Sequence, residues 1–324
     1  MALIIREADV ERLVTMREMV AALETAFHEQ GLGAATNEPR RRVRTPGGGI
    51  LHLLGGALPG QGVIGFKAYT SFRPKTRFLV TLYDSNDGHL LALIESDRLG
   101  QLRTGAATGV ATKYMARTGK PGQPFTLGCF GAGYQARTQV EAVCAVRPVG
   151  RLRVYSPTAA SREAFAAEMG AALGIQAEAV ATPEAVAEDA DILVTATTAR
   201  EPVLRARWLA PGVHLNAAGA NMLLRRELDD TIIRWAGRIA VDSIDQAQLE
   251  ASDLISPREQ GLLYWERLVE LRQIVAGQVV GRSNDEEITV FKSLGIGLED
   301  VAAGALAYRK ALAAGAGETI ALLD

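Results

Sequence analysis

Long apolar runs are missing from this chain of 324 residues. The opening MALIIREADV reaches the charged Arg6 after a short apolar run, which is far less than the core of a signal peptide. No later run approaches the about 20 apolar residues that span a membrane. We therefore expect no membrane segment and a cytoplasmic protein.

Cysteine is scarce and charge is balanced. Cys129 and Cys144 are too few for a disulfide framework. Their predicted positions, in a buried strand and on a helix, are typical of packing residues rather than nucleophiles. Lys and Arg number 35 against 37 Asp and Glu, so the net charge is −2. This balance argues against a strongly basic surface for nucleic acid or an anionic membrane. We also expect no metal ion.

Apolar residues make up 48% of the chain, enough for a large core and about two domains. Residues 8–30 have a helical pattern, and short strands separated by Gly and Pro follow between residues 40 and 94. Their succession favours a mostly antiparallel sheet. Residues 97–117 are again helical and end at the breaker Thr118–Gly122, a predicted domain boundary.

Strands and helices alternate after this breaker. The predicted strands cover residues 125–129, 152–155, 175–179, 192–195, 213–216 and 238–241. Such alternation is typical of a parallel sheet with helices on both faces, a doubly wound α/β fold. A last strand at residues 288–291 precedes an amphipathic helix, residues 298–312, which we expect to return to the first domain.

The strongest motif is the stretch FTLGCFGAGYQART, residues 125–138. A strand-like run leads into Gly131, Gly133 and Ala136, the G-x-G-x-x-A form of the dinucleotide-binding turn, and a helix-like run follows. Gly131 permits the sharp turn, Gly133 lets the backbone approach a pyrophosphate, and Ala136 keeps the helix close to the strand. The phosphates would lie at the helix N-terminus. This stretch therefore predicts a Rossmann domain that binds NAD or NADP.

The residues after the second strand of this domain favour NADP. In NAD-binding domains, an acid at the end of that strand bonds the adenosine ribose. Here Tyr155 is followed by Ser156, Thr158 and Arg162, with no carboxylate at the ribose position. Hydroxyls and a guanidinium suit a 2′-phosphate. Thr158 could instead only cap the next helix, and NAD stays the alternative.

Three basic residues of the first domain suit a carboxylate substrate. Arg41 lies at a strand start, Lys67 lies inside an apolar strand, and Arg103 lies on a helix with small neighbours. Guanidinium binds a carboxylate in a bidentate manner, and an ammonium can also donate a proton. By spacing alone, a lysine in a strand or an arginine on a helix is usually a solvated surface charge.

A second basic run precedes the strand at residues 78–83. Arg73, Lys75 and Arg77 alternate along an extended segment, which would place them on one side. They are either a solvated charge run or a site for a second, distal carboxylate of the substrate.

Six segments, in this order, resemble the ornithine cyclodeaminase/μ-crystallin family. They are GFKAYTSF, DGHLLALIESDRLGQLRTGAATGVATKYMAR, LGCFGAGYQARTQVEAV, TATTAREPVL, PGVHLNAAGAN followed by REL, and ITVFKSLGIGLEDVAAGALAY. The resemblance extends from about residue 8 to residue 312. Members of that family include cyclodeaminases, an alanine dehydrogenase, and reductases of cyclic ketimines, pyrroline-2-carboxylate and iminosuccinate, all using NAD(H) or NADP(H).

The resemblance implies a substrate-binding and dimerisation domain, residues 1–118 with 294–324, and an inserted Rossmann domain, residues 119–293. It implies a homodimer, and it assigns Arg41, Lys67 and Arg103 to the substrate carboxylate. The positions that it assigns to the cofactor are Thr76, Tyr134, Gln135, Ser156, Thr158, Thr197, Asn216, Ala217 and Ser293.

One position departs from the family pattern. Cyclodeaminases and the alanine dehydrogenase carry an aspartate where this chain has Asn221. An amide cannot hold negative charge or exchange a proton near neutral pH. Asn221 therefore counts against those two activities and leaves imine reduction open, unless it is a plain turn residue.

These inferences predict an NAD(P)H-dependent reductase of a small α-imino acid, reversible as an amino-acid dehydrogenase. Lys67 is the expected proton donor, with Arg103 and Asn221 as the other expected catalytic residues. One alternative is an ornithine cyclodeaminase with tightly held NAD. Another is a binding protein of μ-crystallin type without turnover.

Overall fold

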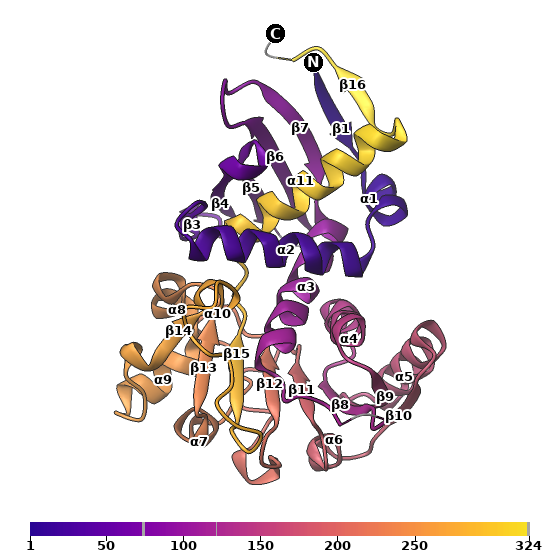
Figure 1. The fold of residues 1–324 in the computed structure, drawn as a ribbon, viewed down its shortest axis with the longest axis vertical. Helices are drawn as coiled ribbons and strands as arrows, with labels where there is room; N and C mark the ends of the chain where they lie inside the picture. Colours follow the sequence, from indigo (N-terminus) through magenta and orange to yellow (C-terminus); the bar gives the residue numbers. More distant parts are fainter. Residues whose placement is uncertain (73–74, 121, 323–324) are drawn as a thin grey trace. The chain divides into compact units, whose positions relative to one another are not determined.

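The computed structural model describes residues 1–72, 75–120 and 122–322, and the chain forms two compact units (Figure 1). Unit 1 comprises Met1–Arg103 and Gly295–Asp324, and unit 2 comprises Thr104–Leu294. The first boundary therefore lies inside helix α3 (Asp97–Met115), earlier than the breaker at residue 118. The second half of α3 belongs to unit 2 because its side chains bond there. Thr108 Oγ1 donates to Gln139 Oε1 at 2.5 Å, and Asn216 Nδ2 donates to Thr112 Oγ1 at 3.0 Å.

Unit 1 is an α+β unit built on one sheet. Among the described residues, its strand order is β16-β1-β7-β6-β5-β4-β2, with β3 also paired to β4. Every pairing is antiparallel except that of β1 with β7, so the expected antiparallel character is confirmed. The strands are β1 (Ala2–Ile5), β2 (Thr36–Asn37), β3 (Arg41–Arg44), β4 (Ile50–Leu58), β5 (Val63–Phe72), β6 (Lys75–Asp84), β7 (Leu90–Glu95) and β16 (Glu318–Ile320).

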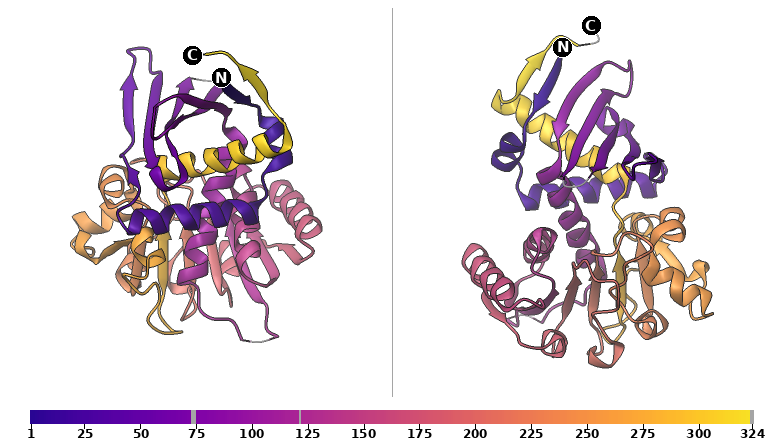
Figure 2. Two further views of the ribbon diagram at one scale, coloured as in Figure 1. Left: turned by 45° about the horizontal axis from the view of Figure 1, so that its top comes forward. Right: turned by 180° about the vertical axis from the view of Figure 1, so that it is seen from behind.

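Helix α11 packs on one face of this sheet, and α2 packs against α11 (Figure 2). The predicted helix at residues 8–30 is two helices, because Thr15 caps the second one: its hydroxyl accepts from Glu18 N, and the Glu18 carboxylate accepts from Thr15 N. Gly304 lets α11 pack closely, since a Cβ there would lie 3.0–3.4 Å from three side chains of the sheet. The helices of unit 1 are α1 (Glu7–Leu13), α2 (Met16–Gly31), the start of α3, the short η1 (Pro59–Gln61) and α11 (Gly297–Ala314).

Unit 2 is the predicted doubly wound domain. Its described strands are all parallel, in the order β10-β9-β8-β11-β12-β15-β13-β14. The first five follow the Rossmann order, with the reversal of strand order between β8 and β11. The strands are β8 (Phe125–Phe130), β9 (Val149–Tyr155), β10 (Gln176–Ala179), β11 (Ile192–Thr195), β12 (His214–Ala217), β13 (Arg238–Val241), β14 (Leu268–Glu270) and β15 (Thr289–Lys292). The sequence did not predict β14.

Both faces of the parallel sheet are covered, because its strands are apolar on both sides. On β11, Ile192 and Val194 join one core with α4 and α5, whereas Leu193 joins the other core with α6, α7 and α9. The helices of unit 2 are the rest of α3, α4 (Tyr134–Val146), α5 (Ala159–Leu173), α6 (Pro183–Ala187), η2 (Ala206–Trp208), α7 (Asp230–Trp235), α8 (Ile244–Glu250), α9 (Ser252–Glu259), η3 (Trp265–Arg267) and α10 (Leu271–Val275).

Candidate active site

The predicted dinucleotide turn joins β8 to α4. Gly131 has a φ of +109°, and a Cβ there would lie 2.4 Å from the carbonyl oxygen of Ala196, so the turn requires glycine. Gly133 is the N-cap residue of α4 and offers no side-chain cap. No described atom beyond its chain neighbours lies within 4 Å of the place where its Cβ would be. Ala136 is fully buried. The turn thus presents an uncapped helix N-terminus, which suits phosphate oxygens.

Two hydroxyls and a guanidinium gather at the end of β9. Arg162 Nη1 donates to the carbonyl oxygen of Ser156 at 3.0 Å, and its guanidinium lies 5.9 Å from the ring centre of Tyr155. Thr158 is the N-cap residue of α5, yet its side chain makes no capping hydrogen bond. Capping therefore does not account for this hydroxyl.

Three of the residues expected to contact the cofactor carry buried polar atoms without a hydrogen-bond partner in the described part of the chain. These atoms are Gln135 Oε1, Asn216 Oδ1 and Ser293 Oγ, and Thr195 Oγ1 is a fourth at the end of β11. Leaving such an atom unsatisfied costs about 1–3 kcal/mol, so each of them calls for a partner. Thr195 and Asn216 lie at the carboxyl ends of neighbouring strands, where open α/β sheets bind their ligands. These residues fit a dinucleotide.

A buried acid joins the loops that carry Thr197 and Asn221. Glu227 accepts from the backbone N–H of Thr197 at 2.7 Å and from its hydroxyl at 2.8 Å. Its other oxygen accepts from the N–H of Gly219 at 2.7 Å and of Ala220 at 3.1 Å. One carboxylate therefore holds the loop after β11 to the loop after β12. Asn221, the next residue, is partly exposed.

Asp253 and Lys292 in turn hold Glu227, and we call these three residues the Glu227 cluster. Asp253 Oδ1 accepts from the N–H of Glu227 at 2.8 Å, and its Oδ2 lies 3.1 Å from Lys292 Nζ. Lys292 Nζ also donates to the carbonyl oxygen of Ala217 at 3.4 Å. All three side chains are fully buried. Burial raises the pKa of Glu227, and the charge of Lys292 opposes this. The sequence alone did not suggest this arrangement.

Lys67 and Arg103 meet in unit 1 around a buried acid. Lys67, on β5, is 4% exposed, and its Nζ donates to Asp300 Oδ1 at 3.1 Å. Arg103, from α3, donates from Nε to the same oxygen at 2.9 Å and from Nη1 to Glu299 Oε2 at 2.8 Å. Arg40 lies nearby, with Nη2 donating to the carbonyl oxygen of Gly295 at 3.1 Å. We call Arg40, Lys67, Arg103, Glu299 and Asp300 the Lys67 cluster.

Glycines make this cluster possible. A Cβ at Gly297 would lie 2.4 Å from the carbonyl oxygen of Gly55, so glycines let the first turn of α11 press against β4. That turn carries Glu299 and Asp300, which sequence reasoning missed. The available signal was an acidic pair, Glu-Asp, at the start of a helix that is otherwise small and apolar. On α3, Gly100 leaves room for the lysine, since a Cβ there would lie 3.0 Å from Lys67 Nζ.

The Lys67 cluster, as defined, contains three basic and two acidic side chains. Burial lowers the pKa of Lys67 to about 8, and the carboxylate of Asp300 opposes this shift. A lysine with a pKa near neutral can exchange a proton at physiological pH, and buried basic side chains are suited to bind an anion.

Strand alternation separates the arginines around β3. Arg41 pairs with Leu53, whose neighbour Leu54 pairs with Lys67. Paired residues share a face and successive residues alternate. Arg41 therefore lies on the face opposite to Lys67 and is exposed, whereas Arg40 is buried in the Lys67 cluster. The structure does not bring Arg41 to Lys67 and Arg103.

The same alternation places the residues of β6. Thr76 pairs with Ser71 and shares the face of Lys67, whereas Arg77 pairs with Thr70 on the opposite face. Both are exposed. The backbone of Lys75 pairs with Phe72, and Arg73 lies outside the described residues. Arg77 is therefore not on the side of Lys67, where a distal carboxylate would need it.

An aromatic layer lies beside Lys67. Its Nζ is 5.7 Å from the ring centre of Tyr69 and 5.1 Å from that of Phe78. His52 stacks on Tyr69 with ring centres 4.1 Å apart, and its Nε2 lies 3.3 Å from Ser71 Oγ. Burial lowers the pKa of His52 to about 4, and the neighbouring arginines add to this. The imidazole is therefore neutral at pH 7 and extends an apolar wall.

The segments that carry the dinucleotide turn and the Lys67 cluster match one protein family. The model of the ornithine cyclodeaminase/mu-crystallin family matches residues 2–315. The chain belongs to this family. The predicted membership and the predicted Rossmann fold class are thus confirmed.

Three relatives of this family member bear on its chemistry. A Δ(1)-pyrroline-2-carboxylate reductase of Bacillus cereus is 38% identical over 75% of this chain and 73% of its own length. The solved structure of the Thermococcus litoralis Δ(1)-pyrroline-2-carboxylate reductase, in complex with NADH and L-proline, is 36% identical, with a TM-score of 0.92 over 98% of this chain and 100% of that one. An archaeal alanine dehydrogenase dimer with bound NAD is 32% identical, with a TM-score of 0.91 over 99% of both chains. These relatives agree with the predicted class, an NAD(P)-dependent oxidoreductase acting on C–N bonds.

Two further expected cofactor positions differ in exposure. Tyr134 begins α4 and is 48% exposed, whereas Ala217 ends β12 and is fully buried. Burial raises the pKa of the Cys129 and Cys144 thiols to about 12, so neither is an activated nucleophile. No helix in the described residues has the length and apolar character of a membrane span.

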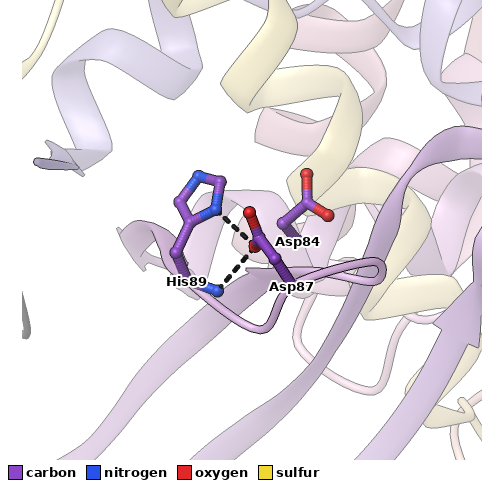
Figure 3. A group of neighbouring side chains, drawn as sticks. All are labelled: Asp84, Asp87 and His89. Atoms are coloured by element: carbon purple, nitrogen blue, oxygen red, sulfur yellow. Dashed lines mark hydrogen bonds and ion pairs between the residues drawn. The ribbon is translucent and has the colours of Figure 1, made fainter.

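Asp84, Asp87 and His89 gather in the turn between β6 and β7 (Figure 3). Asp87 Oδ1 accepts from the N–H of His89 at 3.0 Å and lies 2.6 Å from its Nδ1. Asp84 Oδ1 accepts from the N–H of Asn86 at 2.7 Å. These bonds are typical of a polar turn.

Proposed function

We propose that this chain is an NAD(P)H-dependent reductase of a cyclic α-imino acid of the Δ1-pyrroline-2-carboxylate type, which in reverse oxidises the cyclic amino acid. The observation that carries the proposal is the Lys67 cluster, in which a buried lysine and a buried arginine share one carboxylate beside an aromatic wall. A relative's structure in complex with NADH and L-proline supports it. We place the reaction in the cytoplasm.

Each residue of the cluster has a part in this reaction. Reduction adds a hydride to the imine carbon, which a dihydronicotinamide supplies when bound, and a proton to the nitrogen. Arg40 and Arg103 attract the carboxylate, and the aromatic wall packs against the ring. Lys67 gives the proton from Nζ and regains one from water. Arg40 here takes the part that the family pattern suggested for Arg41, because strand alternation points Arg41 away.

Unit 2 holds the cofactor in this proposal. The turn at Gly131 and Gly133 takes the pyrophosphate, and the unsatisfied atoms of Gln135, Asn216 and Ser293 take polar groups of the dinucleotide. Ser156, Thr158 and Arg162 suit the 2′-phosphate of NADPH, although the relatives' structures contain NADH and NAD. We also propose a homodimer, with the archaeal dimer as its support.

A substrate panel tests the activity. We expect NADPH or NADH oxidation to be fastest with Δ1-pyrroline-2-carboxylate or its six-membered homologue, and slower with pyruvate or oxaloacetate plus ammonia. Arg40→Ala should lower kcat/KM roughly 10- to 150-fold, the cost of a charged hydrogen bond, and more than Arg41→Ala does. If Arg41→Ala lowers kcat/KM as much as Arg40→Ala or more, Arg41 and not Arg40 binds the carboxylate.

An assay with ornithine tests the main alternative, an ornithine cyclodeaminase. Asn221 cannot hold charge beside the substrate nitrogens, so the wild-type protein should make no proline from ornithine. Proline and ammonia forming at a rate that matches imine reduction would identify a cyclodeaminase. A ligand-binding protein would bind the imino acid and oxidise no cofactor.

A further inference from the structure

We propose that Asp300 is a positioning residue for proton transfer, which holds the Lys67 ammonium in place and charged until its proton passes to the imine nitrogen. Glu299, its neighbour on α11, has a different role and orients Arg103. This inference rests on the proposed function and adds two acids that the family pattern did not assign.

The geometry of α11 separates the two acids. Asp300 Oδ1 accepts from Lys67 Nζ at 3.1 Å and from Arg103 Nε at 2.9 Å, so one oxygen joins both cations. Glu299 Oε2 accepts from the other edge of the guanidinium, Nη1, at 2.8 Å. Asp300 is fully buried, and its Oδ2 lacks a hydrogen-bond partner among the described residues. A buried carboxylate of this kind is costly unless cations hold it, so its place depends on Lys67 and Arg103.

The groups that face Lys67 come from several elements. Arg103 on α3 and Arg40 before β3 lower the pKa of Lys67, and so does burial, which is the largest cause. On the sheet it faces Tyr69 and Phe78, and the stacked His52 is neutral because burial depresses its pKa to about 4. Asp300 contributes the carboxylate that opposes these effects, through charge and a hydrogen bond.

This opposition has a chemical consequence. Lys67 can protonate the imine nitrogen only while it is an ammonium, and afterwards it is a neutral amine that takes a new proton from water. The carboxylate of Asp300 keeps Lys67 protonated at neutral pH. By accepting one N–H bond of the ammonium, it also fixes the direction of the other two. Without that carboxylate, Lys67 would lose its proton at a lower pH, because desolvation and two arginines would act unopposed.

The test compares Asp300→Asn with Glu299→Gln, a matched loss of one negative charge from adjacent residues. Reduction of Δ1-pyrroline-2-carboxylate is followed from pH 6 to 10. Activity of the wild type should fall above about pH 8, as Lys67 deprotonates. In Asp300→Asn, this alkaline limb should move down by about one pH unit or more, the effect expected of a charge within bonding distance. In Glu299→Gln, KM should rise through Arg103 while the limb stays in place.

Two results would overturn the proposal: an unmoved limb in Asp300→Asn, or an equal displacement in both variants. If Asp300→Asn does not fold, Asp300→Glu carries the test. It retains the charge one methylene away, so the limb should stay while kcat falls. A displaced limb or an unchanged kcat in Asp300→Glu would be evidence against positioning by Asp300.

A second measurement does not depend on the reaction. Lys67 binds its proton less tightly in the folded than in the unfolded chain, so the free energy of unfolding should rise with pH above about 8. The onset of this rise should move down in Asp300→Asn and stay in Glu299→Gln. If the wild type reduces no imino acid, the proposed function fails, and this onset still decides whether Asp300 sets the protonation of Lys67.

Discussion

The charge and the contacts of a single side chain in this molecule depend on its burial and on the face of the strand or helix on which it lies. Arg40 and Arg41 are adjacent and chemically identical, yet one is buried beside Lys67 and the other is exposed on the opposite face. Lys67 itself would be an ordinary cation in water. Its pKa of about 8 comes mainly from losing that water.

The end of β9 allows a residue-scale prediction about the cofactor. Arg162→Ala should raise the Michaelis constant for NADPH about 10-fold or more, because a guanidinium–phosphate contact is lost. The constant for NADH should hardly change. Arg151→Ala is the control, since Arg151 lies on β9, whereas Arg162 lies on α5, and Arg151 pairs with Glu178 at 2.7 Å. Steady-state kinetics with both cofactors would settle this, and a wild type that favours NADH would contradict the NADP preference.

Secondary-structure elements here are joined by buried carboxylates. Glu227 ties the loop after β11 to the loop after β12, because its carboxylate accepts hydrogen bonds from three backbone N–H groups and one hydroxyl. Asp300 does the same for α3 and β5 from the first turn of α11. In both places the elements alone would leave these polar groups unsatisfied.

Glu227→Gln therefore tests the loops at the element scale. An amide has one acceptor oxygen, and its NH₂ group would face N–H donors, so the free energy of unfolding should fall by about 1–3 kcal/mol. The Michaelis constant for the cofactor should rise more than that for the imino acid, since Thr197 and Asn221 lie in these loops. Urea denaturation and kinetics measure the two effects. Glu259→Gln, an exposed position on α9, serves as the control. Unchanged stability would mean that Glu227 needs no negative charge.

The sheet of unit 1 packs against α11 on the face that carries Lys67. Its other face exposes apolar side chains, among them Val43 at 57%, Ile64 at 45% and Leu79 at 38%. Phe66 and Tyr83 stack there with ring centres 6.5 Å apart. An exposed apolar face of this kind is typical of a protein–protein interface, and a second copy of the chain is the partner that the archaeal dimer suggests.

Light scattering during size exclusion should accordingly give twice the chain mass of 34.5 kDa. Ile64→Lys, which places a charge on this face, should shift the protein toward the monomer. Leu249→Lys is a matched control, because Leu249 is 61% exposed on α8 of the other unit. A monomeric wild type, or an Ile64→Lys dimer as stable as the wild type, would locate the interface elsewhere or remove it.

The sequence by itself determined the alternation of strands and helices from β8 to β13, and the dinucleotide turn. Both depend on local rules: alternating apolar strands, and glycine where φ is positive at Gly131. Lys67 and Arg103 were singled out by their residue type, which suits a carboxylate, together with the resemblance to the family. What they contact could not be read from the chain.

Only the tertiary structure decided which charges meet. Asp300 is 233 residues from Lys67, and the packing of α11 over the sheet brings them to 3.1 Å. The choice between Arg40 and Arg41 depended on strand register, since one residue of displacement turns every side chain to the other face. The division of α3 between the units likewise followed from hydrogen bonds to distant residues. Local sequence specifies the helices and strands. The burial of a side chain, its ion pairs and the register of its strand depend on residues that are far apart in the chain.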